Sequence, residues 1–241
     1  MKPQPVKKLD PARPLGENAA RIVKVRLDEL LGFSPKALDR EAIKPQHDMR
    51  IAAKRLRYVL EVTGFVFGKP ADTARRRARD LQDILGEIHD CDVMLPRVRR
   101  HLERLQQRDA ARVRASAGRA PDLDPRLAAR AQHRTAYRGL DVLGVYLEAR
   151  RELLQDHFAD FWRRQEQTGT WVRLERVIDG HLRRVREARR AAKAAERARE
   201  RAEAAERAAR QAEAQAERAR LDRERAEEER SRPLHAPDTG A

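Results

Sequence analysis

The segment HDMRIAAKRLRY, residues 47–58, concentrates side chains that could bind an anion. It contains one histidine and four Lys or Arg residues. A guanidinium group binds phosphate oxygens in bidentate fashion, an ammonium group acts as a point charge, and a protonated imidazole donates two hydrogen bonds. A phosphate nearby would also raise the pKa of such a histidine. The residue types therefore point to phosphate chemistry.

The spacing sorts these residues onto the two faces of a helix. At about 100° per residue, one face forms a basic ribbon about 15 Å long, with Arg55 beside it. This ribbon carries His47, Arg50, Lys54 and Arg57. The opposite arc predicts a core face made of Met49, Ala52, Ala53, Leu56, Val59, Leu60 and Thr63. Solvated helix faces usually alternate charge, whereas like charges stacked at i+3 and i+4 repel. An anionic ligand therefore explains the ribbon better than simple solvation.

The next predicted helix repeats this arrangement over residues 74–92. Its basic face holds Arg75, Arg79, Gln82, Gly86 and His89, with Arg76 beside it. Glycine in mid-helix costs about 1 kcal/mol relative to alanine, and Gly86 could admit either a crossing helix or an elongated ligand. Two such ribbons side by side predict a groove for a linear polyanion. Tyr58 is the one aromatic residue on these faces, which favours bare phosphate over stacked bases.

Composition agrees with a polyanionic partner. Charged residues make up 39% of the chain, and residues 191–241 hold 12 basic and 12 acidic residues. The net charge of +15 therefore lies within residues 1–190. Such an excess suits nucleic acid, a membrane surface or polyphosphate. The single cysteine, Cys91, excludes an intrachain disulfide, and no secretory signal or membrane-spanning run is visible, so we expect a cytoplasmic protein.

The composition predicts an all-α fold, since Ala, Arg, Leu and Glu dominate and sequence patterns typical of β-strands are scarce. Four segments are predicted: a disordered basic N-terminus at 1–15, a helical domain at 16–187, a long charged helix at 188–230 and a disordered tail at 231–241. Helices are expected over 17–31, 46–62, 71–93, 97–117 and 126–167, and from Thr170 onward. Gly32 should end the first of these helices, Pro96 should begin the fourth, and Gly139–Gly144 should interrupt the fifth. Phe65 and Phe67 should cap the core.

Alanine fills the a and d positions of a heptad repeat that begins at Ala188. A seam of alanine alone buries little area. The segment is thus either a solvated single helix or a weak coiled coil through which the chain self-associates.

Two quoted stretches resemble a known family. HDMRIAAKRLRYVLE fits H-x-x-R-x-x-x-[KR]-R-L-R, and ARDLQDILGEIHDCDVMLPRV fits D-L-Q-D-x-L-G-x-x-x-D-x-D-V. In this order and spacing they resemble the CHAD family, the conserved-histidine α-helical domains. The strong resemblance covers residues 45–98, and residues 17–31 fit the leading helix of the family.

The resemblance implies a helical bundle of two related halves around a basic channel. It also implies non-catalytic binding of inorganic polyphosphate, often on polyphosphate granules. The second half is divergent here, with His133, Arg134 and Arg138 in a weaker pattern. The candidate polyphosphate-binding residues are His47, Arg50, Lys54, Arg55, Arg57, Arg75, Arg76, Arg79 and His89. No catalytic residue, cofactor or metal is expected.

Two other functions stay open at this stage. The basic charge also fits a nucleoid or RNA-binding protein, although no zinc finger, RNP or helix-turn-helix signature is visible. The pairs His47-Asp48 and His89-Asp90 superficially suggest a metal-dependent phosphohydrolase, but the Arg and Lys residues around both histidines would repel a cation.

Overall fold

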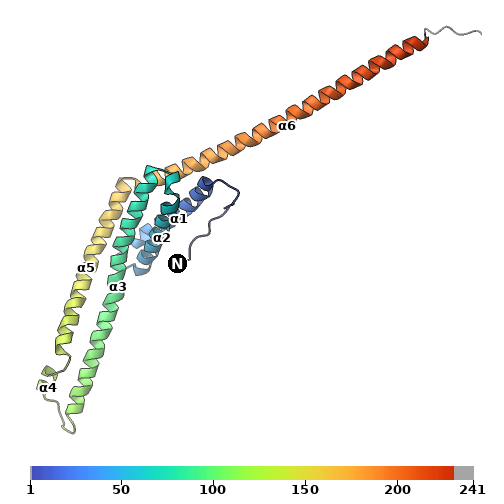
Figure 1. Ribbon diagram of the computed structural model, residues 1–241. Coiled ribbons are helices and arrows are strands. Elements are labelled where there is room, and N and C mark those ends of the chain that lie inside the picture. The colour runs from blue at the N-terminus through green and yellow to red at the C-terminus, as the bar shows by residue number, and fades with distance from the viewer. Residues whose placement is uncertain (1, 231–241) are drawn as a thin grey trace, which may run out of the picture. The chain divides into compact units, whose positions relative to one another are not determined.

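The computed structural model describes residues 2–230, and every regular element within that range is helical (Figure 1). The predicted all-α fold with a long C-terminal helix is confirmed. The chain divides into two compact units, Met1–Arg183 and Arg184–Ala241. No helix within residues 2–230 has an apolar stretch long enough to cross a membrane.

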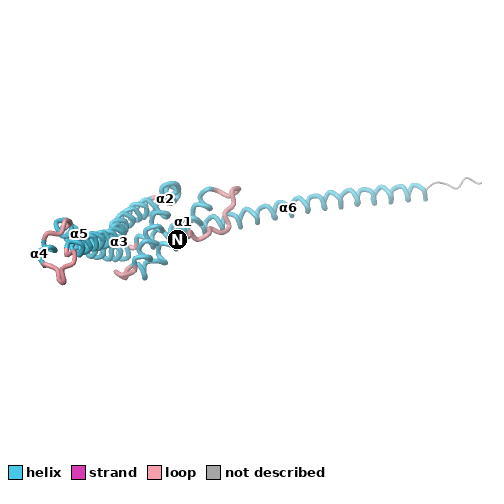
Figure 2. The backbone as a smooth tube through the Cα atoms, turned by 90° about the horizontal axis from the view of Figure 1, so that it is seen from below, coloured by secondary structure: helices cyan, strands magenta, loops and turns pink. Residues whose placement is uncertain are grey.

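The first unit is a helical bundle in which α2 packs between α1 and α3, and α5 packs along α3 (Figures 1 and 2). Its elements are α1 (Leu15–Ala37), α2 (Ile43–Thr63), the 3₁₀ turn η1 (Gly64–Val66), α3 (Lys69–Ser116), α4 (Pro125–Ala129), α5 (Arg134–Gln167) and the beginning of α6 (Thr170–Arg230).

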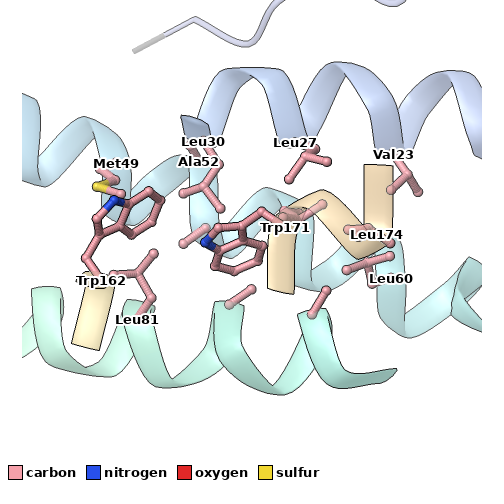
Figure 3. Close-up of a cluster of buried hydrophobic side chains, with 14 of the residues drawn as sticks. Val23, Leu27, Leu30, Met49, Ala52, Leu60, Leu81, Trp162, Trp171 and Leu174 are labelled. Carbon is pink, nitrogen blue, oxygen red and sulfur yellow. The ribbon is translucent and has the colours of Figure 1, made fainter. Parts of the chain in front are cut away.

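Two tryptophans anchor the core. Trp162 near the end of α5 and Trp171 at the start of α6 stack with ring centroids 6.0 Å apart, and both are almost fully buried. Figure 3 shows them among side chains of α1, α2 and α3, including Leu27 and Leu81. Gly169, at φ +61°, forms the tight turn between their helices. Burying an aromatic of this size contributes about 4–6 kcal/mol, so this turn holds the bundle together.

The second unit continues α6 as a charged helix. The described side chains after residue 185 are exposed. Ion pairs one turn apart join Glu203 to Arg207, Glu206 to Arg210, and Arg220 to Glu224. Such pairs support either a single helix or a weak coiled coil, so both alternatives for this segment remain. The predicted disordered tail, 231–241, lies outside the described residues.

The start of α6 at Thr170 is confirmed, and the helix runs without a break through residue 187, where the helical domain was predicted to end. Residues 2–14 have no regular helix, but they hydrogen-bond to the bundle, for example from Gln4 to Glu29 and between Asp10 and Asn18. The predicted disorder of the N-terminus stays a prediction.

The predicted break at Pro96 is wrong. Helix α3 continues through this residue for 48 residues in all. Proline in a helix interior costs about 3 kcal/mol. Here Cys91, Leu95 and Val98 pack against Leu147 of α5 on both sides of the proline, and Pro96 itself is exposed. Packing of the α3–α5 pair therefore outweighs the lost backbone hydrogen bond.

The breaks expected at glycines are also wrong. Helix α1 passes Gly32 and ends at Ala37, because Phe33 and Ala37 pack on the core beyond it. Helix α5 passes Gly139 and Gly144 without interruption. A glycine costs only about 1 kcal/mol in a helix, less than the packing of the residues around it contributes.

Only one of the two phenylalanines after α2 caps the core. Phe67 is 4% exposed, whereas Phe65 is 74% exposed. The η1 turn places the two side chains on different sides, so the expectation for Phe65 is wrong.

A polar cluster closes the far end of the α3–α5 pair. Asp109 of α3 is buried and accepts hydrogen bonds from the backbone N–H of His133, at 2.9 Å, and from the hydroxyl of Tyr137. His133 Nδ1 lies 2.8 Å from its second oxygen. Hydrogen bonding, first from Tyr137, lowers the pKa of Asp109 to about 2, and burial raises the pKa of Tyr137 to about 12. The histidine of the divergent second half is thus a structural partner of Asp109.

We expect Tyr137→Phe to lower the melting temperature by a few degrees at pH 7, because it removes a donor to a buried carboxylate. The folded-state pKa of Asp109 is depressed, so its stabilising effect is present above the unfolded value near 3.9 and is lost as pH falls toward about 2. The difference between wild type and Tyr137→Phe should narrow over that pH range in thermal unfolding followed by circular dichroism. A constant difference from pH 7 to pH 2 would contradict this assignment.

Candidate functional site

The core faces predicted for α2 and α3 are confirmed. All residues of the predicted α2 arc are buried except Val59, which is partly buried. The apolar arc predicted for α3 is buried throughout and consists of Ala74, Ala78, Leu81, Ile84, Leu85, Ile88 and Cys91. Because the apolar arcs of the two helices share one core, their basic faces lie at the surface of the same hairpin.

The two histidines of the basic faces meet. The rings of His47 on α2 and His89 on α3 have centroids 4.7 Å apart and planes inclined by 45°. The Nδ1 atoms of both are buried and have no hydrogen-bond partner within the described part of the chain. The two basic faces predicted from separate helices are therefore brought together at this end.

The register of the α2–α3 hairpin indicates which other residues of the two basic faces lie opposite one another. At the turn, a side chain at Gly64 would touch Ala71 at 3.7 Å, while His47 meets His89 at the other end. Counting one residue forward on α2 for each residue back on α3 from the His47–His89 contact pairs Arg50 with Gly86 and Lys54 with Gln82. We call the resulting surface the basic seam, formed by His47, Arg50, Lys54 and Arg57 of α2 and by Arg75, Arg79, Gln82, Gly86 and His89 of α3.

Several polar atoms of the basic seam are buried without a protein partner. They include Nε of Arg50, Nε of Arg57 and Oε1 of Gln82, counting partners among residues 2–230. Arg57 reaches Glu61 only with a terminal nitrogen, at 3.6 Å. The two Nε groups are donors, whereas the Gln82 oxygen is an acceptor. An unsatisfied buried donor costs about 1–3 kcal/mol, so an anion that accepts from the two Nε groups would bind favourably.

Two basic side chains of the seam lie close to the ring of Tyr58. The Arg57 guanidinium carbon lies 4.6 Å and the Lys54 ammonium 5.7 Å from the centre of its ring. These distances are within the range of cation–π attraction. The ring therefore helps to position positive charge.

The remaining predicted residues lie at different places around the helices. Arg75 is partly buried, and Arg79 is exposed with Nε 3.8 Å from Asp83. Arg76 is exposed and lies about 100° around α3 from Arg75, beside the seam. Arg55 is partly buried and lies on the opposite flank of α2 from Arg50. Their roles in binding stay predictions.

Gln82 is the side chain that the sequence-based site left out. It lies on the same face as His89, and its buried oxygen lacks a protein partner within residues 2–230. The signal was its position on the predicted ribbon. A neutral amide does not stand out among arginines, so residue type alone would not have identified it.

The two His-Asp pairs do not come together as a metal site. Asp48 is buried and pairs with Lys44, whereas Asp90 is exposed. Across the described residues, no group of three or more His, Cys, Asp or Glu side chains is arranged to hold a metal ion.

The electrostatic environment of the basic seam acts on His47. Partial burial, and then the positive charge of His89 and Arg50, lowers the pKa of His47. The free protein therefore disfavours the protonated imidazole of His47. A bound anion would oppose this effect and favour the imidazolium.

The α2–α3 hairpin lies within a segment that matches a known protein family. Residues 2–99 match the CHAD domain. The CHAD resemblance is thereby confirmed over α1, α2 and the first part of α3, which includes the whole basic seam. The CHAD match ends within α3, so α5 and α6 lie outside it. Comparisons with curated proteins and with solved structures gave no match.

We expect acidification to destabilise the ligand-free protein through His47. Its folded-state pKa is lowered, so the unfolded chain binds the proton more readily, and stability falls as pH drops below about 6.5. When the pH is lowered from 7.5 to 5.5, the melting temperature of His47→Gln should fall less than that of wild type. His101→Gln, an exposed histidine farther along α3, serves as the control and should behave like wild type. Equal acid sensitivity of His47→Gln and wild type would contradict this reading.

Proposed function

We propose that this protein binds inorganic polyphosphate along the basic seam, without catalysis. The contact between His47 and His89 carries the proposal, because it joins two helical rows of cations into one surface. The CHAD match over residues 2–99 supports it, since that resemblance implies polyphosphate binding and a location on cytoplasmic polyphosphate granules.

The form of the basic seam suits a linear chain of phosphates. Its α2 row spans about 15 Å along the helix axis, and cations recur at each turn. The guanidinium groups of Arg50 and Arg57 can donate charge-assisted hydrogen bonds to phosphate oxygens, and such bonds are about twice as strong as those between neutral groups. The seam therefore offers repeated sites to a repeating ligand.

Nucleic acid is the second candidate, favoured by the net charge of +15. Sequence-tolerant binding of single strands depends on aromatic platforms for the bases. Tyr58 is the aromatic residue of this surface, and Arg57 and Lys54 already lie over its ring. This arrangement favours bare phosphate over bases.

The deciding experiment measures binding of long-chain polyphosphate at about 150 mM salt with EDTA and competing double-stranded DNA. We expect tight binding that persists with both additions and falls steeply with salt, because binding releases condensed counterions. Displacement by DNA would favour a nucleic-acid-binding protein. Binding that requires a divalent metal would favour the phosphohydrolase alternative.

Charge reversal tests the site itself. The variant Arg50→Glu/Lys54→Glu/Arg57→Glu should weaken polyphosphate binding by at least about 100-fold, because three charge-assisted contacts are replaced by repulsion. Circular dichroism should show unchanged helicity. The control carries Arg199→Glu, Arg218→Glu and Arg223→Glu, which change the net charge equally at exposed positions of α6. Equal loss in both variants would mean that binding depends on net charge and not on the seam.

Removing residues 188–241 should leave polyphosphate affinity within about twofold of the full chain, because residues 191–241 carry no net charge and Arg189 and Arg190 are the only other charged residues removed. Binding is measured by the same titration. Sedimentation of both proteins also tests the proposal that the alanine heptads self-associate. A large loss of affinity on truncation would assign α6 a part in binding.

A further inference from the structure

Gly86 has no structural reason to be a glycine. It lies in the interior of α3, where glycine costs about 1 kcal/mol relative to alanine. Its backbone φ is not positive, unlike that of Gly68, Gly118 and Gly169. A Cβ atom added at Gly86 would meet nothing within 4 Å. Neither backbone conformation nor packing within the described chain explains the residue.

The same observation decides between the two roles that the sequence left open. A glycine that permits helix crossing would have atoms of a neighbouring helix close to the position of an added Cβ atom. Gly86 has open space there instead. The helix-crossing role is therefore wrong for the described structure.

The position of this space is informative. Gly86 lies one turn from His89 and one turn from Gln82, both of which hold buried polar atoms without a protein partner in residues 2–230. Counting residues from the His47–His89 contact pairs Gly86 with Arg50. The Nε atom of Arg50 also lacks a protein partner within residues 2–230. Of these three atoms, Nε of Arg50 can donate a hydrogen bond to a phosphate, and so can Nδ1 of His89 when it carries a proton, whereas the Gln82 oxygen cannot.

We propose that Gly86 is a positioning residue that lets the phosphate chain lie against the α3 backbone between Arg50 and the histidine pair. This inference rests on the proposed function. The amide groups of a helix interior are already bonded to carbonyls one turn earlier, so Gly86 supplies room and no hydrogen bond. The donors are the side chains around it. A side chain at this position would hold the phosphates away from the buried donors.

The test uses substitutions with opposite effects on stability and binding. Gly86→Ala should raise the melting temperature, because alanine favours the helix and no atom obstructs it. It should weaken polyphosphate binding at least about threefold, and Gly86→Leu about tenfold or more. Gly139→Ala is the matched control, since Gly139 also lies in a helix interior with open space. It should raise the melting temperature without changing affinity.

The outcomes separate this inference from the proposed function. If wild type fails to bind polyphosphate, the proposed function falls and this inference with it. If wild type binds and both Gly86 variants bind equally well, Gly86 is not a positioning residue, while the proposed function stands. A lower melting temperature of Gly86→Ala would also overturn the inference, because it would reveal a structural need for glycine.

Discussion

The register between α2 and α3 is the constraint on which the basic seam depends. Small residues of both helices are fully buried in the core that the helices share, namely Ala52 and Ala53 on α2 and Ala74 and Ala78 on α3. Small side chains let two helix axes approach toward the lower end of the usual 8–10 Å range. The polar rows at the edge of such a close contact must also come close, and the touching rings of His47 and His89 are the result. Larger residues in the core would separate the rows and leave two weak cationic faces in place of one strong surface.

This arrangement is unfavourable for the isolated hairpin. Basic side chains gather on one surface, and buried nitrogens of the basic seam lack protein partners in the described chain. The acidic neighbours compensate weakly, since Arg57–Glu61 and Arg79–Asp83 are separated by 3.6 and 3.8 Å and all four side chains are at least partly accessible. Stability must come from elsewhere, and the stacked tryptophans of α5 and α6 supply it in the hydrophobic core (Figure 3). Functional surfaces commonly violate local rules in this way while the rest of the fold offsets the cost.

The sequence predicted the seam better than it predicted the helices. The two-faced character of α2 depends only on a period of about 3.6 residues, which is a local property, and the core arc from Met49 to Thr63 was recovered. Continuity through Pro96 depends on packing against Leu147, about fifty residues farther along the chain, which no local pattern reveals. The Asp109–Tyr137 contact was missed for the same reason, because nothing in the sequence indicates that α3 and α5 align at that point. Local periodicity was therefore sufficient to predict which face of a helix is buried. Where a helix ends depends on long-range packing, which the local sequence does not show.

The distribution of charge gives the two units different relations to a polyanion. Residues 1–190 carry the whole excess of +15, whereas residues 191–241 balance 12 basic against 12 acidic residues. A strongly acidic extension would compete with phosphate for the basic seam, and a strongly basic one would bind polyanions without regard to the seam. The balanced helix does neither, since its charges are largely satisfied by pairs one turn apart such as Glu206 and Arg210. Its composition thus allows a long helix to continue from the bundle while the attraction for a polyanion stays concentrated in the unit that holds His47 and His89.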